Sequence, residues 1–297
     1  MKPSQQKVII ILGCGVLAVS TSAIFIRLAL VAATTTGVGF SLFLAATRLN
    51  LAALLLIPTY STWNRSELTR KGIYYAALAG LCLALHFAFW ITSLSFTSIA
   101  ASTTLVTTNP LWIAIISWLC YQEKPNQKTS LGIVLAIAGG IMISLSNPES
   151  NPEIIPKPWL GNLLALLGSF MASLYLLSGR IAQTQGLTTQ AYIAIAYSTA
   201  ALILLPLPLL WGESYFNHPQ IIYLYSLLMA IFPQLIGHTS FNWAMRHFSA
   251  TLVSLVILLE PVGSTILGLI FLGETPANLV ILGGLIILSG VALAIIH

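Results

Sequence analysis

Two dipeptides that contain proline interrupt long apolar runs of the sequence, Asn109-Pro110 and Glu260-Pro261. A proline inside a helix removes one backbone donor and leaves the carbonyl group four residues earlier without its partner. Within a membrane, such backbone must face protein or water. The two matched breaks therefore predict a polar site near the middle of the membrane. Two ordinary proline kinks are the alternative.

Glu260 is the most costly of these residues to place in a membrane. A charge at the centre of a membrane helix costs about 2.5–3.5 kcal/mol on insertion scales, so another interaction must offset it. We expect Glu260 either to carry a coupling proton or to hold a substrate ammonium group. The alternative is an internal partner for Arg48 or Arg27 that fixes helix packing.

Arg48 stands about ten residues into its apolar run, which also places it near the middle of the membrane. Its guanidinium group could hold a substrate carboxylate through two parallel hydrogen bonds. An internal ion pair, or a bond to the free carbonyl groups of a broken helix, is the alternative. Arg27 lies nearer the end of its run, where a long side chain reaches the membrane surface.

Polar and aromatic residues recur on two further runs. His86 and Trp90 are four residues apart and therefore share one helix face, and the later run carries His238, Asn242 and Trp243. Within the membrane such faces line a cavity or a neighbouring helix, and aromatic rings suit a cationic or aromatic ligand. The alternatives are packing roles for the histidines and places in an interfacial aromatic belt for the tryptophans.

Several other chemistries are excluded by what the sequence lacks. There is no aspartate, no GxxxxGK[ST] motif, no HExxH or GxSxG motif, and no Cys/His ligand cluster. We therefore expect no ATP hydrolysis, no other enzymatic activity, no cofactor and no metal. The net charge of +5 is explained by basic loops of a membrane protein, so we expect no nucleic-acid partner.

The composition and the apolar runs predict which secondary-structure elements carry these residues. Of the 297 residues, 57% are hydrophobic and only 6% are charged, which predicts a membrane protein. A helical span needs about 20 residues. Long apolar runs, which predict ten transmembrane helices in an all-α fold, occur at 8–31, 38–58, 72–94, 98–120, 129–146, 159–180, 189–211, 220–245, 249–272 and 277–296.

The distribution of basic residues predicts the orientation. An even number of spans places both termini on one side, and nine of the Lys and Arg residues then fall on that side, against Lys157 alone on the other. Because basic residues accumulate in cytoplasmic loops, both termini should be cytoplasmic. We expect the protein in the inner or plasma membrane.

The two halves of the chain repeat each other. His86 recurs as His238, and the residues 151 positions after Pro110, Glu123, Pro125, Gly132 and Gly139 are Pro261, Glu274, Pro276, Gly283 and Gly290. Five spans per copy is an odd number, so the second copy must enter the membrane from the opposite side. We expect two inverted five-helix repeats, 1–148 and 149–297, around a central cavity.

The segments NPLWIAIISWLCYQEKP, from Asn109, and LEPVGSTILGLIFLGETP, which contains Glu260, resemble the paired motifs of the EamA branch of the drug/metabolite transporter superfamily. Arg48-Leu49 is similar to the Arg-Phe pair of that family, with leucine replacing phenylalanine. The resemblance spans essentially the whole chain. It implies a ten-helix inverted-repeat fold with a central cavity, and export or exchange of amino acids, other small metabolites or drugs.

The residues and the resemblance together predict a secondary active transporter for small metabolites. Opposite charges at Arg48 and Glu260, with aromatic rings nearby, would suit an amino acid that has an apolar side chain. Protons are a candidate coupling ion. A passive channel, a membrane subunit that does not transport, and an intramembrane enzyme are the alternatives. The substrate, the direction of transport and the oligomeric state, including a monomer, are left open by the sequence.

Overall fold

The computed structural model of the protein describes residues 4–33, 37–63, 68–97, 99–122, 124–145, 157–272 and 278–295. Regular structure in these ranges is entirely helical. Seven of the described helices are long and apolar enough to cross a membrane, and three shorter apolar helices accompany them. Together these helices cover the ten apolar runs of the sequence. The chain is therefore an all-helical integral membrane protein.

The first half of the chain forms five spans, the fourth of which is broken. Its helices are α1 (Gln5–Ala33), α2 (Val38–Leu56) with the 3₁₀ turn η1 (Ile57–Thr62), α3 (Arg70–Ser93), α4 (Ile99–Val106), α5 (Asn109–Tyr121) and α6 (Gln127–Leu145). At the start of α3 the hydroxyl of Thr69 accepts a hydrogen bond from the Gly72 amide, 3.0 Å away. This cap satisfies a donor that the helix itself leaves unpaired.

The second half repeats this order. It consists of α7 (Pro158–Thr184), α8 (Thr189–Leu204), α9 (Leu207–Leu210), α10 (Gln220–Met229), η3 (Ala230–His238), α11 (Thr239–His247), α12 (Ala250–Ile257), α13 (Glu260–Leu272) and α14 (Asn278–Ile295). The elements α10, η3 and α11 form one continuous span, in which η3 is π-helical and contains Pro233. The elements α12 and α13 form a second broken span.

Packing between the helices follows a twofold pattern that exchanges the two halves. The third span, α3, packs along the sixth, α7, and correspondingly the first span, α1, packs along the eighth, α10 to α11. Corresponding helices of the two halves also contact each other directly: α2 packs against α8, and α6 packs against α14. This is the pattern of two inverted five-helix repeats.

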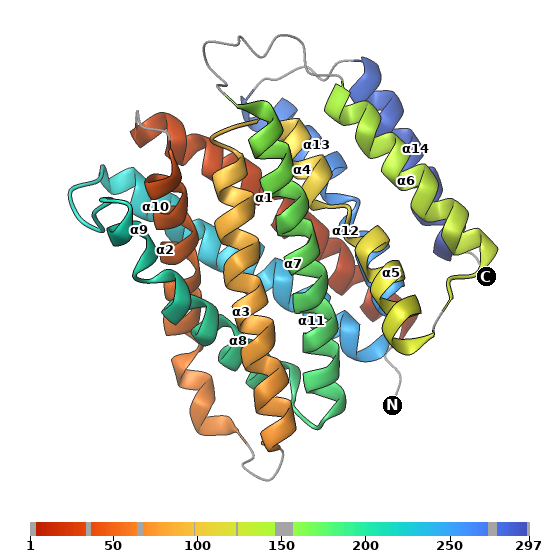
Figure 1. The fold of residues 1–297 in the computed structure, drawn as a ribbon, viewed down its shortest axis with the longest axis horizontal. Helices are drawn as coiled ribbons and strands as arrows, with labels where there is room; N and C mark the ends of the chain where they lie inside the picture. Colours follow the sequence, from red (N-terminus) through yellow and green to blue (C-terminus); the bar gives the residue numbers. More distant parts are fainter. Residues whose placement is uncertain are drawn as a thin grey trace.

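Glycines make the contact between α6 and α14, which lie side by side at one edge of the bundle (Figure 1). A Cβ atom on Gly139 would lie 2.5 Å from the carbonyl oxygen of Gly283, and one on Gly290 would lie 2.6 Å from that of Gly132. Early residues of each helix thus meet late residues of the other. The two helices are antiparallel, which the inversion of the second repeat requires.

Some expectations fall on residues outside the described ranges. Glu123, Glu274 and Pro276 lie there, and so does the boundary at 148 between the two predicted repeats. The boundary therefore stays a prediction.

Candidate functional site

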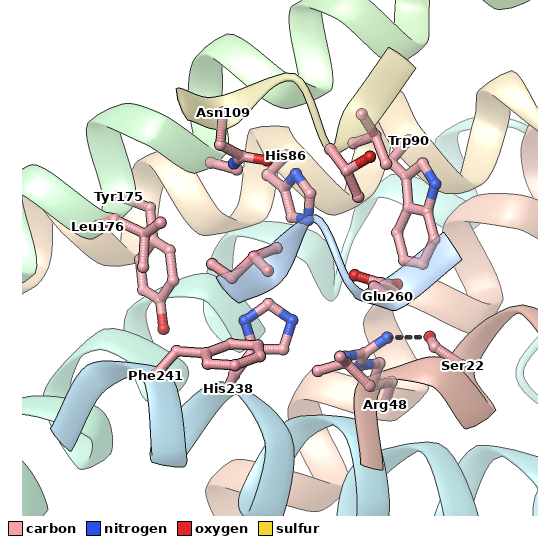
Figure 2. Close-up of a pocket in the computed structure, with 15 residues that line it drawn as sticks. Ser22, Arg48, His86, Trp90, Asn109, Tyr175, Leu176, His238, Phe241 and Glu260 are labelled. Atoms are coloured by element: carbon pink, nitrogen blue, oxygen red, sulfur yellow. Dashed lines mark hydrogen bonds between the residues drawn. The ribbon is translucent and has the colours of Figure 1, made fainter. Parts of the chain in front are cut away.

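A narrow cavity of about 40 Å³ lies inside the bundle, between residues of both halves (Figure 2). Its walls are formed by α1, α2, α3 and α7, together with the broken spans and the η3 to α11 segment. Most of its surface is apolar, and Val19, Leu176 and Phe241 contribute to it. Six of the eight predicted substrate or coupling residues line it, namely Arg48, His86, Trp90, Asn109, His238 and Glu260.

Both helix breaks lie at this cavity. Helix α4 ends at Val106 and α5 begins at Asn109, while α12 ends at Ile257 and α13 begins at Glu260. All four residues line the cavity. Pro110 and Pro261 each occupy the second position of the helix that follows the break. Proline is tolerated there, because the amide groups of the first turn have no partner within the helix.

Two serines hold the breaks in corresponding ways. The hydroxyl of Ser20 on α1 bonds the carbonyl oxygen of Val16 in its own helix at 2.8 Å and also lies 3.3 Å from the carbonyl oxygen of Glu260. The hydroxyl of Ser173 on α7 likewise bonds the carbonyl oxygen of Ser169 at 2.9 Å and lies 3.5 Å from that of Asn109. Both serines are fully buried. Each broken span is thus anchored to a long unbroken helix of the opposite repeat.

Arg48 is completely buried, and three other elements hold its guanidinium group. Its Nε donates to the amide oxygen of Gln234 on η3, at 3.0 Å, and its Nη1 donates to the hydroxyl of Ser22 on α1, at 2.9 Å. Its Cζ lies 4.2 Å from the ring centroid of Phe87 on α3. Arginine has five N–H donors. Two donors are used in these bonds, so three of the five are not engaged by them.

Glu260 lies in the wall next to Arg48, and both side chains point into the same space (Figure 2). Within the described part of the chain, these two charged groups come no closer than the 4.0 Å limit of an ion pair. Opposite charges buried inside the protein attract each other more strongly than they would in water.

The two symmetry-related histidines face each other across the cavity. The ring centroids of His86 and His238 are 6.4 Å apart. Nδ1 of His86 lies 2.9 Å from the carbonyl oxygen of Gly168, which can only accept, so this nitrogen carries the proton. The indole of Trp90 stacks on His86 with a centroid separation of 5.8 Å. Together these rings form an aromatic wall with polar edges.

The other two predicted residues lie outside the cavity lining. The side-chain amide of Asn242 donates to the hydroxyl of Tyr175 and, at 3.4 Å, to that of Tyr197. Trp243 lies in a separate groove on the outside of the bundle. It is five residues from His238, about 140° further around the helix. Phe241, at a spacing of three residues, faces the cavity in its place.

Several residues of the site were not predicted from the sequence. Ser22, Tyr175 and Phe241 line the cavity, and Gln234 holds Arg48. A polar residue next to Pro233 in an apolar run was a signal for Gln234. Ser22 and Tyr175 resemble the many hydroxyl groups that bond within their own helices. In the described residues there is no group of three or more His, Cys, Asp or Glu that could hold a metal ion.

The fold and the cavity define a polytopic membrane protein with two inverted five-helix repeats around a central polar site. Residues 6–145 and 159–296 each match the model of the EamA-like transporter family. The chain belongs to this family, and it is therefore a membrane transporter.

Curated relatives include named exporters. The chain is 26% identical over 250 residues to the threonine/homoserine exporter RhtA of Escherichia coli strain K12, with 82% of this chain and 79% of that protein covered. It is 24% identical over 229 residues to the pseudopaline exporter CntI of Pseudomonas aeruginosa strain PAO1, with 76% and 77% covered. A crystal structure of a protein at 18% identity superposes with a TM-score of 0.75 and covers 98% of this chain, which supports the fold alone.

Proposed function

We propose that this transporter is a secondary active carrier that exports or exchanges small zwitterionic metabolites, with amino acids that have apolar side chains as the best candidates. It works in the inner or plasma membrane with both termini in the cytoplasm. The observation that carries the proposal is the placement of Arg48 and Glu260, opposite in charge and unpaired with each other, in one cavity.

The cavity offers a complementary surface for each part of such a substrate. The donors of Arg48 suit a carboxylate, and the carboxylate of Glu260 suits an ammonium group. Val19, Leu176 and Phe241 supply an apolar surface for the side chain. The exporter names of RhtA and CntI agree with small metabolites as cargo, and the threonine and homoserine of the former are amino acids.

The size of the cavity supports a carrier that changes shape. A volume of about 40 Å³ holds about three water molecules, which is less than an amino acid needs. The walls must therefore move apart for a substrate to enter. The broken spans are suited to that movement, because each consists of two short helices joined at the cavity.

Glu260 is the proposed coupling residue. A carboxylate can bind either a proton or a substrate ammonium group, but it does not hold both. Competition between them at a single site would couple proton entry to substrate release. His86 and His238 line the same cavity as Glu260.

Counterflow in proteoliposomes tests the proposal. Vesicles loaded with one unlabelled amino acid at a time receive a trace of the labelled compound outside, and a carrier accumulates the label transiently whereas a channel does not. We expect accumulation for apolar amino acids and its loss in Arg48→Gln. Arg27→Gln, which changes an exposed arginine outside the cavity, is the control. Absence of counterflow across the whole panel would contradict the proposed substrate class.

A further inference from the structure

A second hollow lies on the outside of the bundle, on the reverse side of one cavity wall. It is a groove of about 550 Å³ between α1, the end of α2, the start of α8, and the η3 to α11 segment. Ile11, Leu235 and Ile236 give it an apolar floor, while Gln190, Ser240 and Trp243 add polar groups. Its volume is within the range of about 300–1,000 Å³ that is usual for ligand sites.

The contacts of α1 with η3 and α11 fix the direction in which this groove runs. A Cβ atom on Gly237 would lie 2.5 Å from Val19, and one on Gly15 would lie 2.8 Å from Ser240. Residue numbers thus fall along α1 as they rise along α11, so the two helices are antiparallel. One turn further, Ile11 and Trp243 both line the groove.

The next turn of both helices carries basic side chains. Lys7 lies four residues before Ile11, and His247 lies four residues after Trp243. The ring centroids of Trp243 and His247 are 4.8 Å apart. Because α1 and α11 are antiparallel, this turn brings Lys7 near His247 and its neighbour Arg246, and the charges of Lys7 and Arg246 act on the His247 imidazole. All three are exposed. We call Lys7, Arg246 and His247 the basic cluster.

An apolar groove that leads to a basic cluster at the end of a membrane helix has the chemistry of a lipid site. Basic side chains at this depth attract anionic headgroups, and tryptophan favours the boundary between headgroup and hydrocarbon. Positive charges on two neighbouring helices repel each other, and an anion bound between them would remove that repulsion. A phospholipid supplies both the anion and the apolar chain.

We propose that the groove binds one anionic phospholipid, with an acyl chain along Ile11 and Ile236 and with its phosphate at the basic cluster. This site is separate from the transport cavity, but it shares a wall with it. Thr239, which lines the groove, lies 3.4 Å from the hydroxyl of Tyr197, to which Asn242 also bonds. A bound lipid therefore packs against the segment that presents His238 and Phe241 to the cavity.

Native mass spectrometry of the full-length protein in detergent tests this site. Phosphatidylglycerol or phosphatidylcholine is added at matched concentrations, and the number and affinity of retained lipids are measured. The wild type should retain one phosphatidylglycerol in preference to phosphatidylcholine. The double substitution Lys7→Gln with Arg246→Gln should weaken that binding about fivefold for each positive charge removed.

The matched control is Lys124→Gln with Lys128→Gln, which removes two exposed lysines from a different part of the chain and should leave binding unchanged. A second variant, Ile236→Trp, fills the groove from a position that is 40% exposed, and it should displace the lipid while every charge is kept. Circular dichroism confirms that each variant is folded.

Three results of these lipid-binding measurements would overturn the proposal. They are equal retention of both lipids by the wild type, equal losses in the two double variants, and full phosphatidylglycerol binding by Ile236→Trp. A dimer whose interface covers the groove and excludes lipid would also contradict the proposal, because the groove would then bind a second copy of the chain.

Discussion

The Nε of Arg48 donates a hydrogen bond of 3.0 Å to the amide oxygen of Gln234, which joins a charge from the first repeat to the π-helical segment of the second. π-Helical turns are rare and are frequently found at functional sites. In this span, η3 carries both Gln234 and the cavity residue His238. Gln234 is therefore a positioning residue for the guanidinium group rather than part of the cavity wall.

Replacement of Gln234 tests this positioning role. Gln234→Leu leaves the Nε of a buried arginine without an acceptor, which costs about 1–3 kcal/mol. We expect a lower thermal unfolding temperature in detergent and a rise of about tenfold in the substrate concentration that gives half-maximal flux, equivalent to about 1.4 kcal/mol.

Two further variants separate positioning from packing. Gln220→Leu changes an exposed glutamine and should alter neither measurement. Gln234→Glu keeps an acceptor for Arg48 but adds a carboxylate that pairs with its positive charge. The protein should therefore remain stable while transport falls. Normal transport by both Gln234 variants would show that Arg48 needs no positioning by this residue.

The glycine contact between α6 and α14 is expected to be intolerant of even one methyl group. A Cβ atom on Gly139 or Gly290 would clash with backbone atoms of the other helix. Backbone cannot relieve such a clash by changing rotamer, as a side chain can. Gly139→Ala and Gly290→Ala should each destabilise the protein by about 1–3 kcal/mol, measured as a loss of thermal stability in detergent. Gly284→Ala meets its nearest atom at 3.7 Å and should be neutral. Equal effects at all three positions would contradict the close helix contact.

Most of the fold was predictable because a membrane leaves few options for the backbone. Apolar runs of about 20 residues must be helices, and an odd number of them per repeat must invert the second copy. The helix breaks were visible for a similar reason, since Asn109-Pro110 and Glu260-Pro261 combine polarity and proline inside apolar runs. The cost of burying a charge likewise singled out Arg48 and Glu260, which do line the cavity.

The remaining site residues depend on packing, which periodicity does not specify. Asn242 and Trp243 follow His238 closely, yet one bonds Tyr175 and the other faces outward, because each residue advances about 100° around a helix. Gln234 is joined to Arg48 across 186 positions of the chain. Ser22 lines the cavity together with residues of the second repeat. No local sequence pattern indicates that these distant residues come together.

The orientation of the protein remains a prediction, and it has a direct test. In a background without the three native cysteines, Ser4→Cys and Asn217→Cys each introduce one thiol at an exposed position. Because the excess of Lys and Arg should be cytoplasmic, a membrane-impermeant thiol reagent added to intact cells should label position 217 and not position 4. The opposite labelling pattern would reverse the proposed orientation.

The most direct test of the central claim is the pH dependence of flux through Glu260→Gln, measured with the best substrate from counterflow. The wild type should transport faster when a proton gradient drives protons across the membrane in the direction opposite to substrate movement. Glu260→Gln cannot exchange a proton, so its flux should fall at least about tenfold, equivalent to about 1.4 kcal/mol, and lose its response to the gradient. Glu213→Gln, in the loop near His218, should behave as the wild type. If Glu260→Gln keeps both the wild-type flux and its pH dependence, Glu260 is not the coupling site and the account is contradicted.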